Sequence, residues 1–184
     1  MSRVHAGRSQ SGAALTPTLV ASTMSTPIGP LSVVARDGVV VAGGFTDDVD
    51  ALTSRLPADI RAAPLTATDD IPHVTDALRA YFDGDVTALD RIVVEQRGGP
   101  FQQQVWAALR AIPPGQPTTY QALAAQLGGQ QLARAVGLGC ATNLIAPIVP
   151  CHRVAGSDGS LRGYYWGLER KRWLLDHEAR HAHR

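Results

Sequence analysis

The sequence predicts an α/β unit over residues 21–96, followed by a mainly α-helical unit over residues 97–178. The first unit contains Asp37-Gly38 between two β-branched segments, which is a strong β-hairpin signal. After Gly98-Gly99-Pro100, apolar residues recur at the spacing of helices instead. Two of the helices expected there are separated by Gly128-Gly129. This pattern is typical of a helix-turn-helix, although other small helical domains share it.

In the first unit, strands are expected over Leu31–Arg36, which alternates, and over Val39–Phe45, which is β-branched and apolar. Residues 47–56 suit a short helix. Apolar residues at every third or fourth position predict a longer helix over Ile71–Phe82. Ile92–Val94 suggests one more short strand. This alternation of strands and helices defines a small α/β unit.

The second unit begins with a helix whose apolar face runs from Phe101 to Ile112, and Pro113-Pro114-Gly115 ends it. Thr118 or Thr119 can cap a second helix. Residues 131–140 predict a third helix that is rich in small residues. A last helix is expected over Leu168–His177.

Two tails are expected outside these units, over residues 1–20 and 179–184. Met1–Gly12 is polar and has no apolar stretch typical of a secretory signal, so a cytoplasmic location is expected. No run of 18 or more apolar residues occurs, which argues against a membrane-spanning helix. His181 and His183 make only a weak candidate for a metal-binding pair.

The chain contains two cysteines, Cys140 and Cys151. A structural disulfide is not expected in a reducing cytoplasm. Two thiols without a second Cys/His cluster also argue against a structural zinc site, so no metal or other cofactor is predicted. Hydrophobic residues make up 45% of the chain and charged residues 18%, a composition that supports a folded core and excludes a broadly disordered chain.

The net charge of +1 conceals an asymmetry between the two halves. Residues 1–96 carry seven Lys or Arg against twelve Asp or Glu, a balance of −5. Residues 97–184 carry ten against four, a balance of +6. Either only the C-terminal half meets a polyanion, or surface charge is scattered by chance; composition leaves both open.

The segment with the clearest chemistry is Pro150-Cys151-His152-Arg153-Val154. A thiol is a strong nucleophile only as the thiolate, and a nearby imidazole or positive charge favours that form. A cysteine hydrolase would use the same Cys-His pair, but it also needs an oxyanion hole, of which the sequence gives no independent sign.

Several further motifs follow one another in the order of one known family. They are Phe101–Trp106, Tyr120–Ala124, Arg134–Gly137, Asn143, Pro150–Val154, Gly167–Lys171, Leu174-Leu175 and Glu178. With these motifs the chain resembles the O6-alkylguanine-DNA alkyltransferases, also called methylated-DNA–protein-cysteine methyltransferases. The resemblance covers about residues 22–178 and is strongest from residue 98 onward.

The resemblance implies a ribonuclease-H-like topology for the first unit and a helix-turn-helix in the second. The implied partner is double-stranded DNA containing O6-alkylguanine, bound through the minor groove with the damaged base flipped into a pocket. The implied reaction is one irreversible transfer of a methyl or alkyl group to the protein, without cofactor or metal. O4-alkylthymine is a candidate second substrate. A monomer is expected, and cooperative assembly on DNA stays open.

The resemblance also assigns the catalytic residues. Cys151 would be the nucleophile and alkyl acceptor, His152 its base through a water molecule, and Glu178 the group that orients His152. Tyr120 would assist base flipping and give a proton toward guanine N3. The alternative for Glu178 is an exposed carboxylate at a helix end.

Other residues are assigned to DNA, to the pocket and to its support. Arg134 would enter the base stack, with Ala135 and Gly137 allowing close approach to DNA unless they serve tight helix packing. Phosphate contacts are expected from Thr118 and Thr119. The base pocket is expected to comprise Val154, Tyr164, Tyr165, Trp166 and Cys140. Support is expected from Asn143, through backbone hydrogen bonds, and from Arg153, which would hold the loop.

Three positions depart from the pattern of the family. Leu144 and Ala146 stand where prolines are common, which puts the rigidity of that loop in doubt. Trp166 stands where many relatives have glycine, and we hypothesise that its bulk reduces tolerance of large alkyl groups. Two other functions remain alternatives: a lesion-binding protein without transfer, and a transcriptional regulator built on the helix-turn-helix.

Overall fold

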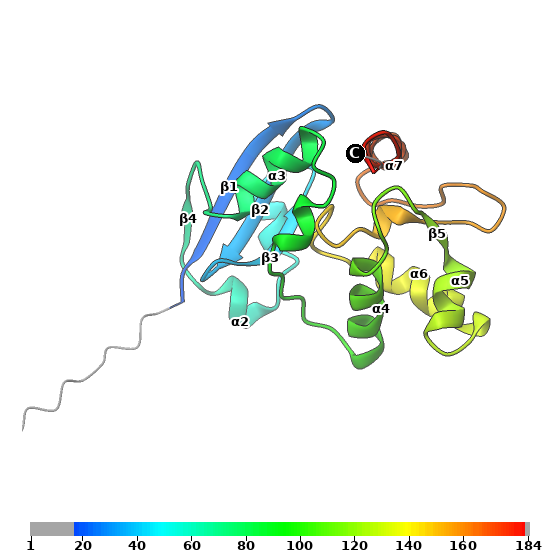
Figure 1. Cartoon of the computed structure of the whole chain (residues 1–184). Coiled ribbons are helices and arrows are strands. Elements are labelled where there is room, and N and C mark those ends of the chain that lie inside the picture. Colours follow the sequence, from blue (N-terminus) through cyan, green and yellow to red (C-terminus); the bar gives the residue numbers. More distant parts are fainter. Residues whose placement is uncertain (1–16, 183–184) are drawn as a thin grey trace, which may run out of the picture.

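The computed structural model describes residues 17–182, so residues 1–16 of the tail expected over residues 1–20 lie outside the described residues, as does His183 of the candidate metal-binding pair. An N-terminal part built on a mixed sheet packs beside a mainly helical C-terminal part (Figure 1). This division agrees with the change of character expected near Gly98. Within the described range, no helix is long and apolar enough to span a membrane.

The sheet consists of β1 (Leu19–Thr26), β2 (Gly29–Arg36), β3 (Val39–Gly44) and β4 (Leu65–Ala67), in the order β3-β2-β1-β4. The pairs β1–β2 and β2–β3 are antiparallel, and β1–β4 is parallel. The hairpin predicted at Asp37-Gly38 is confirmed: both residues have positive φ, 52° and 79°, as a tight two-residue turn requires.

The expected tail over residues 1–20 is wrong at its end, because β1 already begins at Leu19. Leu19 is 1% exposed, and its N–H donates to Pro64 O at 2.8 Å. The strand pairs on both sides, with β2 and with β4, so burial and hydrogen bonds fix residues that look like a tail in the sequence.

Helices cover both faces of the sheet. On one face lie α3 (Val74–Phe82) and the short helix η1 (Ala88–Arg91). On the other face, α1 (Val49–Thr53) and α2 (Ala58–Arg61) bury a second apolar cluster. The strand suggested over Ile92–Val94 is reduced to one bridge between Val40 and Val94.

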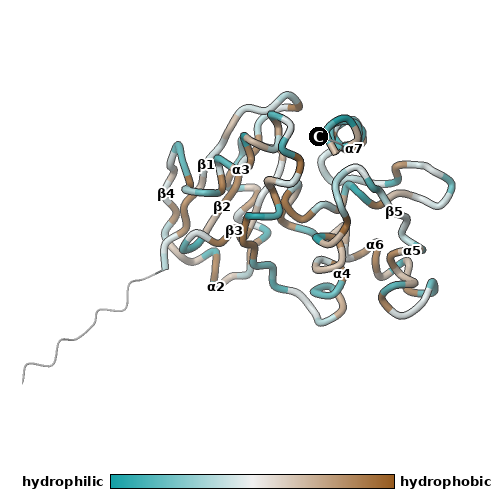
Figure 2. Tube along the Cα trace, viewed as in Figure 1, coloured by the Kyte–Doolittle hydropathy of each residue, from teal (hydrophilic) through white to brown (hydrophobic). Residues whose placement is uncertain are grey.

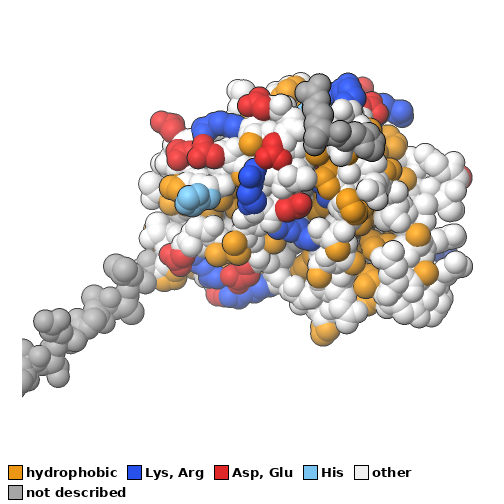
Figure 3. Space-filling view, in the orientation of Figure 1, with side chains coloured by type: hydrophobic (Ala, Val, Ile, Leu, Met, Phe, Trp, Pro, Cys, Tyr) orange, Lys and Arg blue, Asp and Glu red, His pale blue; other side chains and the backbone are white. Residues whose placement is uncertain are grey.

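The C-terminal part is built mainly from short helices. They are α4 (Pro100–Arg110), α5 (Tyr120–Gln126), η2 (Gln130–Leu132), α6 (Ala133–Ala141), η3 (Cys151–Arg153) and α7 (Leu168–His181). Two short strands, β5 (Thr118–Thr119) and β6 (Val154–Ala155), pair in parallel. On the face in Figure 3, charged side chains gather over the N-terminal part and around α7, and hydrophobic ones are frequent over α4.

The expected tail over residues 179–184 is also wrong in its first part, because α7 continues to His181. The N–H of Ala182 donates to Glu178 O at 2.8 Å, and His181 Nδ1 lies 2.8 Å from His177 O. The ring of His181 packs on Gly84, where a Cβ atom would lie only 2.8 Å from the ring. Packing against the N-terminal part therefore extends the helix beyond the charged pattern that suggested a tail.

One hydrophobic core joins the two parts. It combines residues of β2 and α3, such as Leu31 and Leu78, with residues of α4 and α7, such as Leu109 and Leu174. The hydrophobic segments of the strands, α3 and α4 meet in this interior (Figure 2).

The segment that leads to Cys151 lies along the edge of the sheet. Gly43 N–H donates to Leu144 O at 2.8 Å, and Ala146 N–H donates to Gly43 O at 3.1 Å. Gln96 Oε1 accepts from the Leu144 N–H. Backbone pairing with β3 therefore fixes the loop that lacks prolines at positions 144 and 146.

Candidate active site

Cys151 lies at the start of η3, directly after the segment that pairs with β3. Its side chain lines a pocket of about 290 Å³. The other walls come from Tyr120 at the start of α5, from α6, and from the loop over residues 163–166. The thiol itself is nearly buried, with 8% of the residue exposed. A substrate atom can therefore reach the sulfur only by entering this pocket.

Asn143 holds the sulfur by a hydrogen bond. Its Nδ2 lies 3.3 Å from Cys151 Sγ and 2.8 Å from Val149 O, to which it also donates. Burial raises the pKa of Cys151, while the Asn143 hydrogen bond and the positive charge of Lys171 act in the opposite direction. The resting thiol is thus neutral, and it needs a base to become a nucleophile.

His152 follows directly and is completely buried. Its Nε2 lies 2.8 Å from Glu178 Oε1. An ionised carboxylate only accepts hydrogen bonds, so Nε2 carries the proton of the neutral ring and Nδ1 is left as a basic nitrogen. Nδ1 has no hydrogen-bond partner among residues 17–182. Burial lowers the pKa of His152 despite the opposing charge of Glu178, so the ring is neutral and able to take a proton.

Glu178 is fully buried, which rules out the alternative of an exposed helix-end carboxylate. It accepts hydrogen bonds from His152, from Arg153 Nε and Nη2 at 2.9 Å each, and from Tyr81 OH at 2.8 Å. Burial raises the pKa of this carboxyl. The charge of His152 when that ring is protonated, the charge of Arg153 and the hydrogen bonds of both residues outweigh that effect and hold the pKa of Glu178 well below its usual range.

Arg153 joins the site to the rest of the C-terminal part. Its Nη1 donates to Ile112 O at 2.6 Å, and its other guanidinium nitrogens bind Glu178. The side chain is almost completely buried, so its charge depends on Glu178 for compensation.

Tyr120 lines the same pocket as Cys151. Burial, with the nearby thiols of Cys140 and Cys151, raises the pKa of Tyr120 to about 12, so the phenol keeps its proton at neutral pH. Thr119 caps α5, its Oγ1 accepting from the Ala122 N–H at 3.1 Å. Thr118 pairs with Val154 in the small parallel sheet.

The loop after β6 forms the aromatic wall of the pocket. Tyr164 is buried at its hydroxyl, which has no partner among residues 17–182, whereas Tyr165 is 65% exposed. The Trp166 ring covers Gly44 of β3, and a Cβ on Gly44 would lie 1.9 Å from the ring. Arg170 donates to Trp166 O at 2.9 Å and to Ile28 O at 2.8 Å. The N-terminal part therefore supports this wall.

Val154 was expected in the base pocket, but the structure places it elsewhere. It is fully buried in β6, does not line the pocket, and its carbonyl accepts from Lys171 Nζ at 2.6 Å. Lys171 is itself buried and also donates to Leu161 O. The sequence places Lys171 in a family motif but does not reveal its role, because one charged residue in a polar helix looks like a solvated one.

The small residues of α6 divide between packing and the pocket. Gly139 serves packing, since a Cβ there would lie 2.8 Å from Val105. Gly137 lines the pocket, and nothing lies within 4 Å of the position of its missing Cβ. Arg134 is exposed on the same helix, and Ala135 is half-buried. The packing alternative therefore applies to Gly139 rather than to Gly137.

Only some of the positive charges counted in the C-terminal half lie unpaired at the surface. Arg153 and Lys171 are buried, and Arg110 donates to four backbone carbonyls. Arg97 and Arg162 pair with Asp59 and Asp158. The charge count therefore overestimates the positive surface that could face a polyanion.

The fold and this site define a class of protein in which a buried thiol, backed by a His–Glu pair, faces a pocket between short helices. A family model described as "6-O-methylguanine DNA methyltransferase, DNA binding domain" matches residues 100–180. The methylated-DNA–protein-cysteine methyltransferase of Salmonella typhimurium is 40% identical over 164 residues, which cover 87% of this chain and 95% of that protein. A relative of the same name from Mycolicibacterium paratuberculosis is 40% identical over 161 residues, covering 87% and 92%.

Solved structures agree with these relatives. The Mycobacterium tuberculosis O6-methylguanine methyltransferase superposes with a TM-score of 0.72 and 34% identity, covering 89% of this chain and 94% of that one. The structure of the M. tuberculosis protein OGT in complex with DNA gives a TM-score of 0.72 and 37% identity, covering 88% and 94%. The chain belongs to the methylated-DNA–protein-cysteine methyltransferase family.

Proposed function

We propose that this protein repairs alkylated DNA by direct reversal, moving the alkyl group of O6-alkylguanine in duplex DNA to Cys151. The observation that carries the proposal is the Cys151 thiol at a pocket, with the His152–Glu178 pair buried directly behind it. A thioether is not readily cleaved, so each molecule acts once. O4-alkylthymine remains a candidate second substrate.

The proposed reaction begins when the Cys151 proton passes to His152 Nδ1 through a water molecule. The thiolate then attacks the alkyl carbon, forming the S–C bond as the C–O6 bond breaks. The imidazolium formed is stabilised by Glu178, which is ionised in the folded protein. The departing guanine takes a proton at N3 from Tyr120, whose pKa of about 12 keeps it protonated until that moment.

For DNA binding, we propose that α5 and α6 form the helix-turn-helix and that α6 lies against the minor groove. Arg134 is exposed on α6 and would replace the flipped base in the stack. Phosphate contacts would come from this region. Thr118 is the better candidate of the two threonines, because the Thr119 hydroxyl already accepts the hydrogen bond that caps α5.

For the N-terminal part, we propose a ribonuclease-H-like topology, supported by two antiparallel hairpin pairs and a parallel fourth strand. Tyr164, Tyr165, Trp166 and Cys140 are proposed to surround the flipped base, with Asn143 and Arg153 supporting Cys151 and Glu178. We further propose a monomer in the cytoplasm, where a reducing environment keeps the two free thiols reduced.

The alternative is a protein that binds the lesion without transferring the alkyl group. The deciding measurement is the intact mass of the protein after mixing with an equimolar duplex that holds one O6-methylguanine. Transfer predicts a gain of one methyl on the wild type, none on Cys151→Ser, and no turnover with excess DNA. Tight binding of damaged DNA without a mass gain would establish the alternative, and continued turnover would indicate hydrolysis instead.

A further inference from the structure

We infer that Tyr81, on the N-terminal part, is a positioning residue that controls the basicity of His152 through Glu178. The inference rests on the proposed function, in which His152 acts as a base, but the pKa of His152 can be measured without any transfer reaction. Tyr81 lies in α3, seventy-one positions before His152 in the sequence, and none of the motifs of the C-terminal half includes it.

The contact joins the two parts of the molecule inside the core. Tyr81 OH donates to Glu178 Oε1 at 2.8 Å, and both residues are fully buried. The same oxygen lies 2.8 Å from His152 Nε2. Oε1 thus accepts hydrogen bonds from the phenol of the N-terminal part, from the imidazole of the catalytic segment and, at 2.9 Å, from Arg153 Nη2.

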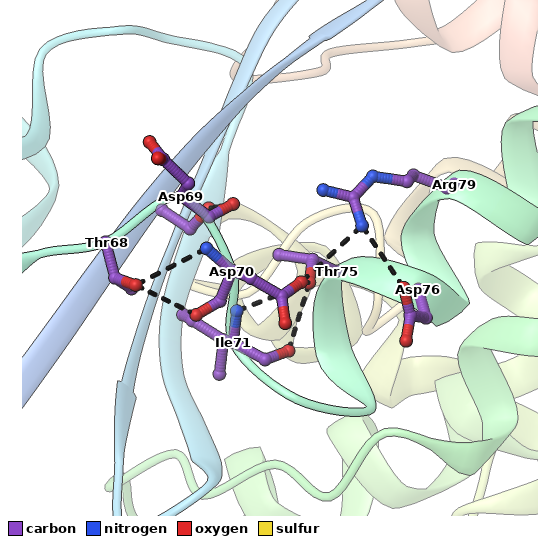
Figure 4. Close-up of polar contacts among 8 residues, drawn as sticks. Thr68, Asp69, Asp70, Ile71, Thr75, Asp76 and Arg79 are labelled. Atoms are coloured by element: carbon purple, nitrogen blue, oxygen red, sulfur yellow. Dashed lines mark hydrogen bonds and ion pairs between the residues drawn. The ribbon is translucent and has the colours of Figure 1, made fainter.

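Separate contacts fix the two ends of α3, and only those at its C-terminal end touch Tyr81 itself. At the start of α3, Thr75 Oγ1 hydrogen-bonds to Asp70 and to Ile71 O, and Arg79 pairs with Asp70 and Asp76 (Figure 4). At the end of α3, His177 Nε2 donates to the carbonyl of Tyr81 at 2.7 Å. The Tyr81 ring also packs edge-on against Phe82 and against His177.

The sign of the effect follows from the charges around Glu178. Glu178 faces His152 and Arg153 on η3 and Tyr81 on α3. On its own helix, α7, it neighbours His177, and the phenol of Tyr164 is close enough to interact with it electrostatically. Lys171 and Arg153 disfavour the imidazolium, and Glu178 favours it. A donor on Oε1 withdraws negative charge from the carboxylate and so weakens the support that Glu178 gives to a protonated His152.

Tyr81 can act only as a donor. Burial and the negative charge of Glu178 raise the pKa of Tyr81 well above its usual value, so the phenol stays protonated throughout the useful pH range. Because the hydroxyl weakens the stabilisation that Glu178 gives to the imidazolium, it helps His152 to remain a neutral base at lower pH. Its removal should therefore make His152 easier to protonate.

The test is the pH dependence of the single-turnover transfer rate in Tyr81→Phe. The rising limb of the profile should move to higher pH, with a loss of about three- to tenfold on that limb, a plateau near the wild type, and unchanged affinity for damaged DNA. Site-specific 3-fluorotyrosine at position 81 keeps the ring and strengthens the donor, so it should move the limb to lower pH.

Thr75→Val is the matched control, because it removes another buried hydroxyl from α3 without touching Glu178. It should lower the unfolding temperature and leave the pH profile unchanged. Equal shifts in both variants, or a Tyr81→Phe profile that superimposes on the wild type, would overturn the inference.

A second readout does not depend on transfer. The imidazole of His152 can be titrated by ¹⁵N NMR in Cys151→Ser protein without DNA, with and without Tyr81→Phe. A higher pKa in the double variant supports the role of Tyr81 even if the wild type proves unable to transfer an alkyl group, in which case only the proposed function fails. An unchanged pKa rejects the inference, whatever the transfer assay gives.

Discussion

The buried network behind Cys151 and the aromatic wall of the pocket differ in how they are built. In the network, the side chains of His152, Arg153 and Glu178 are almost completely buried and are joined by hydrogen bonds to the carboxylate of Glu178. Opposite them, the loop with Tyr165 and Trp166 is aromatic and partly open to solvent. A buried charge cannot lose its partner without a large penalty, whereas an apolar wall can change size at modest cost. Substitutions in the buried network should therefore affect stability and chemistry, and substitutions in the aromatic wall should affect binding or selectivity.

The largest effect is expected for Glu178→Gln in the buried network. The change leaves Arg153 as an uncompensated buried charge and removes the carboxylate beside His152. We expect a loss of about 3–5 kcal/mol in the free energy of unfolding, measured by urea denaturation at pH 7, together with slower transfer.

The pH dependence of this loss has a definite sign. The pKa of Glu178 in the folded protein lies well below its unfolded value of about 4.3, so its ionised form stabilises the fold above that value. This stabilisation is lost as pH falls toward the folded pKa. The difference between wild type and Glu178→Gln should thus shrink below about pH 4, and a constant difference would contradict the assignment.

The next effect concerns Arg134→Ala on α6, the helix that we propose lies against DNA. Loss of an exposed arginine that contacts DNA should weaken binding about tenfold and reduce the salt slope of binding, measured by fluorescence anisotropy. The unfolding free energy should stay unchanged. The neighbouring exposed Gln131→Ala is the control, and an equal loss in both variants would argue against a specific role for Arg134.

A smaller and selective effect is expected for Trp166→Gly on the aromatic wall. Removal of the ring opens the pocket beside Gly44, so transfer from O6-benzylguanine should rise about tenfold relative to O6-methylguanine. Trp166→Phe should lie between the two proteins. If the wild type already reacts equally fast with both substrates, the hypothesis of a size limit set by Trp166 is rejected.

The smallest effect is expected for Cys140→Ser, although Cys140 lines the same pocket as Cys151. Burial and the neighbouring Cys151 raise the pKa of Cys140, and no side-chain donor within residues 17–182 supports its thiolate. Transfer should change by no more than about twofold, measured as the rate of mass gain. A methyl group found on Cys140 of the wild type would show that the two thiols share the reaction.

Some features of this protein are local, and the sequence alone was enough to predict them. The turn at Asp37-Gly38 is one, because two residues with positive φ select Asp and Gly directly. The Cys151–His152 pair is another, since adjacent residues need no folding to lie near each other. The bounds expected for the two tails were wrong, because Leu19 and His181 belong to elements that are stabilised by contacts with residues far away in the sequence.

The tertiary structure alone decided which side chains surround the reactive groups. Tyr81, His152 and Glu178 meet because α3, η3 and α7 pack on one core, and no periodicity within any of them encodes that meeting. The tertiary structure also decided which charges are buried: Arg153 and Lys171 lie in the interior, where they donate hydrogen bonds, while Arg134 lies at the surface. The free energy of a charge depends on its burial and its partners, and both exist only once the chain has folded.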